Sequence, residues 1–135
     1  MRRTASPLPY PTLFAVPVAA GFPSPADDYV DKPLCLNELL VPRPAATFFV
    51  RMPDDSMIGA HFHRGDLLVV DRSLRPGDGR IVVAKVAGEL MVRRLVVRGQ
   101  RGWLHAVHPD HLNIELKEGL DYRIMGVVRW RVHAV

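Results

Sequence analysis

A serine that could act as a nucleophile lies near the middle of the chain, where Ser56 follows Asp54 and Asp55 and precedes Gly59 by three residues. A serine hydroxyl attacks poorly at neutral pH unless a neighbouring base takes its proton and hydrogen-bond donors hold the oxyanion that forms. A serine beside aspartates is more often a helix cap than a nucleophile. Ser56 therefore indicates a catalytic site only if other features of the sequence agree.

A second chemical feature is an accessible peptide bond in the first third of the chain. Ala19, Ala20 and Gly21 are small residues within residues 1–45, a segment that holds nine of the twelve prolines. Proline removes a backbone donor and interrupts regular pairing, and small residues in such a segment leave the backbone open to attack. We expect residues 1–45 to form an extended N-terminal arm with at most a short helix, at residues 36–40.

Six histidines raise the question of a metal site. His61 and His63 lie two residues apart, and His105, His108 and His111 are spaced by three. A zinc site needs three or four converging ligands and a supporting second shell, and no second cysteine or suitable His–Glu motif joins these residues. We expect surface histidines, with no metal site and no cofactor, although a histidine base near the serine is chemically reasonable.

Seven apolar, valine-rich or aromatic runs follow the arm. They are bounded by glycine, proline and charged residues, which is typical of short β-strands, and they span residues 47–51, 66–71, 80–86, 90–98, 103–107, 113–116 and 124–132. Ala87-Gly88 predicts a two-residue hairpin turn between the third and fourth runs. The fold class is mostly β, and residues 46–135 are expected to form one compact β-rich barrel or sandwich.

The composition limits the location and the partners. The single cysteine, Cys35, permits no internal disulfide and lies between two leucines, which favours a buried thiol and a cytoplasmic protein. No apolar run approaches the roughly 20 residues that a membrane-spanning helix needs. The net charge is +4 and the sequence pI about 9.7. Because the arginines are scattered, we favour a solvated basic face over a surface that binds nucleic acid directly.

In combination, the motifs of this chain resemble the UmuD-like members of the LexA family of self-cleaving serine peptidases, of the S24 type. The resemblance extends over most of residues 13–132 and rests on residues 21–30 (GFPSPADDYV), 36–40 (LNELL), 46–50 (ATFFV), 55–58 (DSMI), 65–71 (GDLLVVD), 88–95 (GELMVRRL) and 126–128 (GVV). Each motif is weak alone, and their common order makes them specific. The resemblance implies a compact LexA-like peptidase fold over residues 46–135.

The resemblance also implies a reaction and a set of partners. In this family a lysine kept neutral by burial takes the proton of the serine, here Ser56. The serine then attacks a peptide bond of the protein's own arm, here Ala20–Gly21. A filament of RecA on single-stranded DNA stimulates this cleavage after DNA damage, in the SOS response. The shortened product forms a homodimer and joins a UmuC-type translesion DNA polymerase.

The chain departs from the family at the catalytic base, because the family motif reads Val-Lys where this chain has Val92-Arg93. Desolvation can drive a lysine to the neutral amine, whereas an arginine stays protonated in proteins and cannot accept the serine proton. Pro53 and Asp54 replace small residues of relatives, and the charge of Asp54 favours a cationic Arg93. We therefore expect self-cleavage to be slow or absent.

Lys85 is the other candidate base. If Ala87-Gly88 forms a two-residue turn, residue 82 pairs with residue 93, and Lys85 points to the face opposite Arg93; a three-residue loop would bring both to one face. We favour the shorter turn, which makes Lys85 a surface lysine. Two other interpretations remain open: a non-catalytic binding module of the same fold that partners a translesion polymerase, and a basic β-barrel that binds nucleic acid.

Overall fold

The structure is a computed structural model that describes residues 11–14 and 30–135. Contacts group the chain into two compact units, Met1–Pro42 and Arg43–Val135. Among the described residues, no helix has the length and apolar character required to cross a membrane.

The described part of the first unit holds a short ladder and a short helix. Strand β1 (Thr12–Phe14) pairs antiparallel with β2 (Val30–Pro33), and helix α1 (Leu36–Leu40) follows. The helix confirms the prediction for residues 36–40, but the ladder was not predicted, because Pro11 precedes β1 and Pro33 lies within β2. Pro33 forms the last residue of β2, where a missing N–H costs little, and the Leu34 N–H donates to the Pro11 carbonyl oxygen at 2.8 Å. The predicted cleavage bond Ala20–Gly21 lies outside the described residues.

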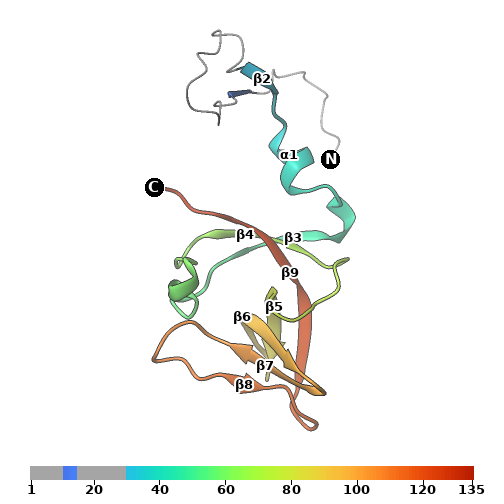
Figure 1. Cartoon of the computed structure of the whole chain (residues 1–135), viewed down its shortest axis with the longest axis vertical. Helices are drawn as coiled ribbons and strands as arrows, with labels where there is room; N and C mark the ends of the chain where they lie inside the picture. Colours follow the sequence, from blue (N-terminus) through green and yellow to red (C-terminus); the bar gives the residue numbers. More distant parts are fainter. Residues whose placement is uncertain (1–10, 15–29) are drawn as a thin grey trace, which may run out of the picture. The chain divides into compact units, whose positions relative to one another are not determined.

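The second unit is built on one antiparallel sheet, which confirms the mostly β fold class. The seven strands lie in the order β3-β4-β9-β5-β6-β7-β8, and the long strand β9 joins the β3–β4 pair to the β5–β8 part of the sheet (Figure 1). The strands are β3 (Thr47–Arg51), β4 (Leu67–Asp71), β5 (Ile81–Val86), β6 (Glu89–Arg98), β7 (Arg101–His105), β8 (Ile114–Glu115) and β9 (Tyr122–Val132). Two 3-10 turns, Pro44–Ala46 and Ile58–Ala60, precede β3 and β4.

Each of the seven predicted runs forms a strand, with ends displaced by no more than two residues. Displacements of two residues occur in β9, which begins at Tyr122 rather than at Ile124, and in β7, which begins at Arg101 rather than at Trp103. Arg98 pairs directly with Arg101, so Gly99 and Gln100 form a two-residue turn, with Gly99 at a φ of 62°. This turn lets the strand begin earlier than its apolar residues indicate.

The central strands are buried on both faces, so the core has two clusters. On β5, Val82 and Ala84 belong to one cluster, while Val83 belongs to the other. The second cluster also contains Met52 and Met57, the residues that bracket the segment carrying Ser56. This segment is therefore held against the sheet by apolar packing on each side of it.

Candidate active site

Ser56 lies in a tight, well-anchored turn between β3 and the 3-10 turn at Ile58–Ala60. The Ser56 N–H donates to Asp54 Oδ1 at 3.0 Å, as in an Asx-type turn. A second segment clamps it, because the Val107 N–H donates to the Ser56 carbonyl oxygen at 2.7 Å and the Gly59 N–H donates to the Val107 carbonyl oxygen at 3.0 Å. The backbone that carries Ser56 is therefore held in a fixed position.

The hairpin of β5 and β6 positions Arg93. Ala87 and Gly88 have φ values of 49° and 82°, as a two-residue turn with both φ angles positive requires. Val82 pairs with Arg93, as the two-residue turn predicted. Lys85 is exposed and pairs with Leu90, so its side chain points to the face opposite Arg93.

Arg93 and Ser56 meet inside the protein. Arg93 Nη1 donates to Ser56 Oγ at 2.7 Å, and the same nitrogen donates to the carbonyl oxygen of Val92 at 2.8 Å. Ser56 is 0% exposed and Arg93 is 6% exposed. The Nε atom of Arg93 is buried without a hydrogen-bond partner among the described residues. The two residues that the sequence selected are thus brought together, although 37 residues separate them.

The charges around Ser56 form a small network. Burial lowers the pKa of Arg93, and the charges of Asp54 and Glu89 oppose this shift. Burial alone raises the pKa of Asp54, but hydrogen bonds with the Ser56 side chain and backbone, together with the charge of Arg93, bring that pKa below its ordinary value. A guanidinium remains protonated in proteins, so a cation and a carboxylate flank the hydroxyl at neutral pH.

This arrangement can stabilise negative charge on the Ser56 oxygen but supplies a poor base. Arg93 donates to the Ser56 oxygen and has no lone pair with which to take a proton. Asp54 is the carboxylate that contacts Ser56, and its lowered pKa makes it a weak proton acceptor. Within the described part of the chain, no histidine hydrogen bonds to Ser56, so the structure does not support a histidine base.

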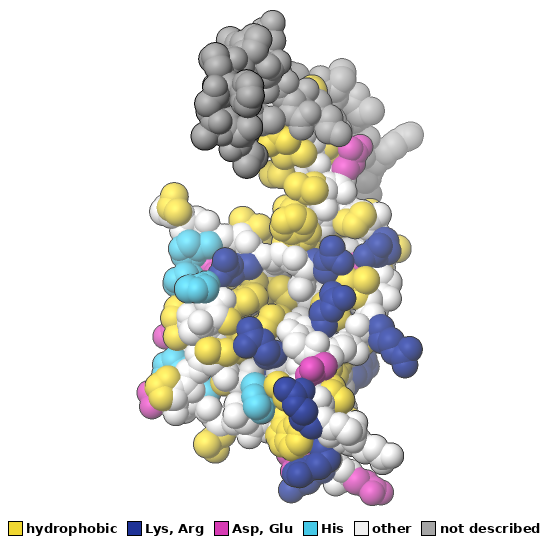
Figure 2. Space-filling model, viewed as in Figure 1, with side chains coloured by type: hydrophobic (Ala, Val, Ile, Leu, Met, Phe, Trp, Pro, Cys, Tyr) yellow, Lys and Arg dark blue, Asp and Glu magenta, His cyan; other side chains and the backbone are white. Residues whose placement is uncertain are grey.

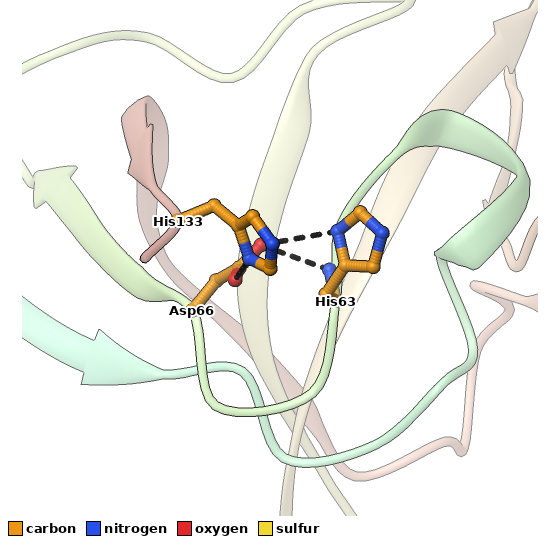
Figure 3. Close-up of side chains that lie close together, drawn as sticks. All are labelled: His63, Asp66 and His133. Carbon is orange, nitrogen blue, oxygen red and sulfur yellow. Dashed lines mark hydrogen bonds and ion pairs between the residues drawn. The ribbon is translucent and has the colours of Figure 1, made fainter. Parts of the chain in front are cut away.

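The histidines that lie close together in space are only partly those that are close in sequence. His108 and His111 contact each other edge to face, with ring centroids 5.0 Å apart. His63 instead lies beside Asp66 and His133, a group that sequence reasoning missed (Figure 3). Nothing in the local sequence points to it, because Asp66 and His133 are 67 residues apart and meet only through the pairing of β4 with β9.

Comparisons with known proteins identify the family of this chain and agree with its fold. The sequence pattern of the family described as "Peptidase S24-like" matches residues 12–129. The chain is 52% identical over 86 residues to protein ImpA of Escherichia coli, covering 64% of this chain and 59% of ImpA. It is 42% identical over 121 residues to protein SamA of Salmonella typhimurium, covering 90% of this chain and 84% of SamA.

A LexA repressor from Shewanella piezotolerans is 34% identical over 99 residues, which cover 73% of this chain and 48% of the repressor. The chain thus spans less than two thirds of the length of ImpA and about half the length of this repressor. The family match covers well over half of the chain. The chain therefore belongs to the Peptidase S24-like family, as a UmuD-like member related to LexA.

Proposed function

We propose that this protein is a UmuD-like regulator of translesion DNA synthesis in the response to DNA damage, whose self-cleaving site is held inactive by Arg93. The observation that carries the proposal is the contact of 2.7 Å between Arg93 Nη1 and Ser56 Oγ, in which both side chains are buried. Membership in the peptidase family supports the lineage, and the hydrogen-bonded turn at Ser56 is consistent with it.

The proposed block is at the first proton transfer. In a serine–lysine site the neutral amine takes the hydroxyl proton as the serine attacks the peptide carbonyl. Here the corresponding position holds a permanent cation that donates to the serine oxygen instead. The Ala20–Gly21 bond is the proposed target, and it stays intact or is cut slowly because Ser56 is not activated.

An uncut chain can still act through binding. We propose that it forms a homodimer in the cytoplasm, responds to RecA on single-stranded DNA, and joins a UmuC-type polymerase. Direct binding to nucleic acid is less favoured, since four arginines are in ion pairs with carboxylates: Arg43 with Asp71, Arg64 with Asp55, Arg98 with Asp78, and Arg101 with Glu115. On the face seen in Figure 2, basic side chains are spread among apolar ones rather than gathered in one patch.

The test is cleavage by the full-length chain in the presence of RecA, ATP and single-stranded DNA. Intact mass spectrometry follows the loss of residues 1–20 in the wild type, in Arg93→Lys, and in the double variant Arg93→Lys with Ser56→Ala. We expect the wild type to stay intact, the single variant to be cut after Ala20, and the double variant to stay intact.

The three proteins test three claims: that the wild-type site is inactive, that only the base is missing, and that Ser56 is the nucleophile. Efficient cutting of the wild type after Ala20 would contradict the inactive site. An Arg93→Lys variant that stays folded and uncut would contradict the claim that only the base is missing, and would favour a binding module whose arm no longer docks. Cutting that persists without Ser56 would contradict its role as the nucleophile.

A further inference from the structure

Two histidines and a buried aspartate meet at one end of the sheet. His63 lies in the loop after the 3-10 turn at Ile58–Ala60, Asp66 directly precedes β4, and His133 directly follows β9. Leu67 pairs with Val132, so the residues just beyond this pair are neighbours in space. The cluster therefore depends on the tertiary fold and not on a local motif.

The three side chains place potential metal-ligand atoms close to one another. One nitrogen from each histidine and one Asp66 oxygen all lie within 4.8 Å of one another. His133 Nδ1 is 2.5 Å from Asp66 Oδ1, and His63 Nδ1 is 3.8 Å from Asp66 Oδ2. The two rings are stacked, with centroids 4.4 Å apart and planes inclined by 29° (Figure 3). Zinc–nitrogen bonds of about 2.0–2.1 Å in a tetrahedral site place neighbouring ligand atoms about 3.4 Å apart, so small side-chain rotations suffice.

The three side chains of the cluster differ in exposure. The Asp66 side chain is 2% exposed and accepts the His63 N–H at 2.9 Å, which fixes the carboxylate. The His63 and His133 side chains are 46% and 43% exposed, so their rings can rotate and leave room for water. A fixed carboxylate with two adjustable imidazoles is a suitable ligand set for a metal with an open coordination position.

We propose that His63, Asp66 and His133 bind a divalent transition metal ion of the zinc class. The two imidazole nitrogens favour such an ion over calcium or magnesium, which prefer oxygen ligands. The ion takes the place of the hydrogen bond between His133 Nδ1 and Asp66 Oδ1, and any proton on the metal-bound nitrogen leaves to solvent, because an imidazole nitrogen binds a metal only in its deprotonated form. Nearby arginines are engaged elsewhere: Arg64 donates to the Pro53 carbonyl oxygen, and Arg131 lies over the ring of Phe62.

The metal links the start of β4 to the end of β9 and is expected to stabilise the second unit. A ligand that binds the folded state alone raises the apparent stability with its concentration. Ser56 and Arg93 take no part in this cluster, so the inference is independent of the proposed function. If the protein binds no zinc, the proposed function is unaffected, and if self-cleavage is not blocked by Arg93, the metal site is unaffected.

The test is calorimetric titration of untagged, chelator-treated full-length protein with zinc chloride, with the thermal midpoint measured in parallel. We expect one ion per chain, a higher midpoint, and affinity weakened by more than about tenfold in His63→Ala and in His133→Ala. Co²⁺ should give the visible absorption of a tetrahedral site in the wild type but not in these variants.

Matched controls are other histidines of the same unit. His61→Asn suits the φ of 68° at that position, because asparagine tolerates it, and His108→Ala with His111→Ala removes the other histidine pair. These controls should bind zinc like the wild type. The proposal is overturned if the wild type binds no zinc, if His63→Ala and His133→Ala bind it undiminished, or if binding is lost with the His108 and His111 pair instead. Circular dichroism checks that each variant is folded.

Discussion

Lys85 and Arg93 lie on opposite faces of the β5–β6 hairpin, because Lys85 pairs with Leu90 while Arg93 pairs with Val82. Side chains alternate along a strand, so the exposed amine of Lys85 cannot reach the buried hydroxyl of Ser56 without a shift in register. Lys85 therefore does not serve as a base for Ser56 in place of Arg93.

Removing Lys85 is therefore predicted to leave catalysis unchanged. In an Arg93→Lys background, Lys85→Ala should alter the self-cleavage rate by less than about twofold, since the two side chains face apart. Intact mass spectrometry over time measures the rate. Loss of cleavage in a folded Lys85→Ala variant would show that Lys85, and not residue 93, supplies the base.

The contact between Ser56 and Arg93 predicts an asymmetry in stability. Ser56→Ala removes an acceptor from a buried guanidinium and is expected to lower the free energy of unfolding by about 1–3 kcal/mol. Arg93→Met removes the buried charge itself and should cost less than about 1 kcal/mol or be stabilising. Urea unfolding of both variants decides this. A larger cost for Arg93→Met would mean that the cation contributes net stability through its contacts.

A side chain added at Gly59 is predicted to disturb the turn that carries Ser56. A Cβ atom at this position would lie 2.3 Å from Val107 Cγ1 and 2.9 Å from the Val107 carbonyl oxygen. Gly59→Ala should lower the free energy of unfolding by about 1–3 kcal/mol through overpacking, and Val107→Ala should recover part of this loss. Gly77→Ala is the control, since nothing lies within 4 Å of its added Cβ. Equal effects of the two glycine variants would contradict this packing.

Asp71 predicts sensitivity to acid. Burial raises the pKa of Asp71, but the hydrogen bonds from Ser73 and the contact with Arg43 outweigh this effect. The net pKa of Asp71 is below its ordinary value of 3.8. The folded-state pKa is thus below the unfolded one, so this stability is present above about pH 4 and is lost as the pH falls through the folded pKa. In the Asp71→Asn variant, the free energy of unfolding should depend less on pH in this acidic range. The exposed Asp110→Asn is the control, and an equally flattened profile there would argue against Asp71 as the cause.

Much of the fold follows from local sequence patterns. Alternation and turn residues predict the seven strands, and the positive-φ turn at Ala87-Gly88 fixes the hairpin register that places Arg93. The β1–β2 ladder was missed because proline-rich flanks argue against pairing. The early start of β7 was missed because Gly99-Gln100 is a weak turn signal.

The site was predicted only in part. Ser56 and Arg93 were identified through the family resemblance, and the structure supplies the contact that no spacing reveals. The unpaired Nε of Arg93 and the clamp from Val107 depend on tertiary packing. His133 lies outside every histidine grouping in the sequence, because only strand pairing brings it to Asp66.

The most direct test of the central claim is self-cleavage of purified protein as a function of pH, without RecA. Arg93→Lys should release residues 1–20 at a rate that rises about tenfold per pH unit below the pKa of the lysine and levels off above it, and the wild type should stay intact throughout. Wild-type cleavage that rises with pH in the same way would contradict the claim that Arg93 leaves Ser56 without a base.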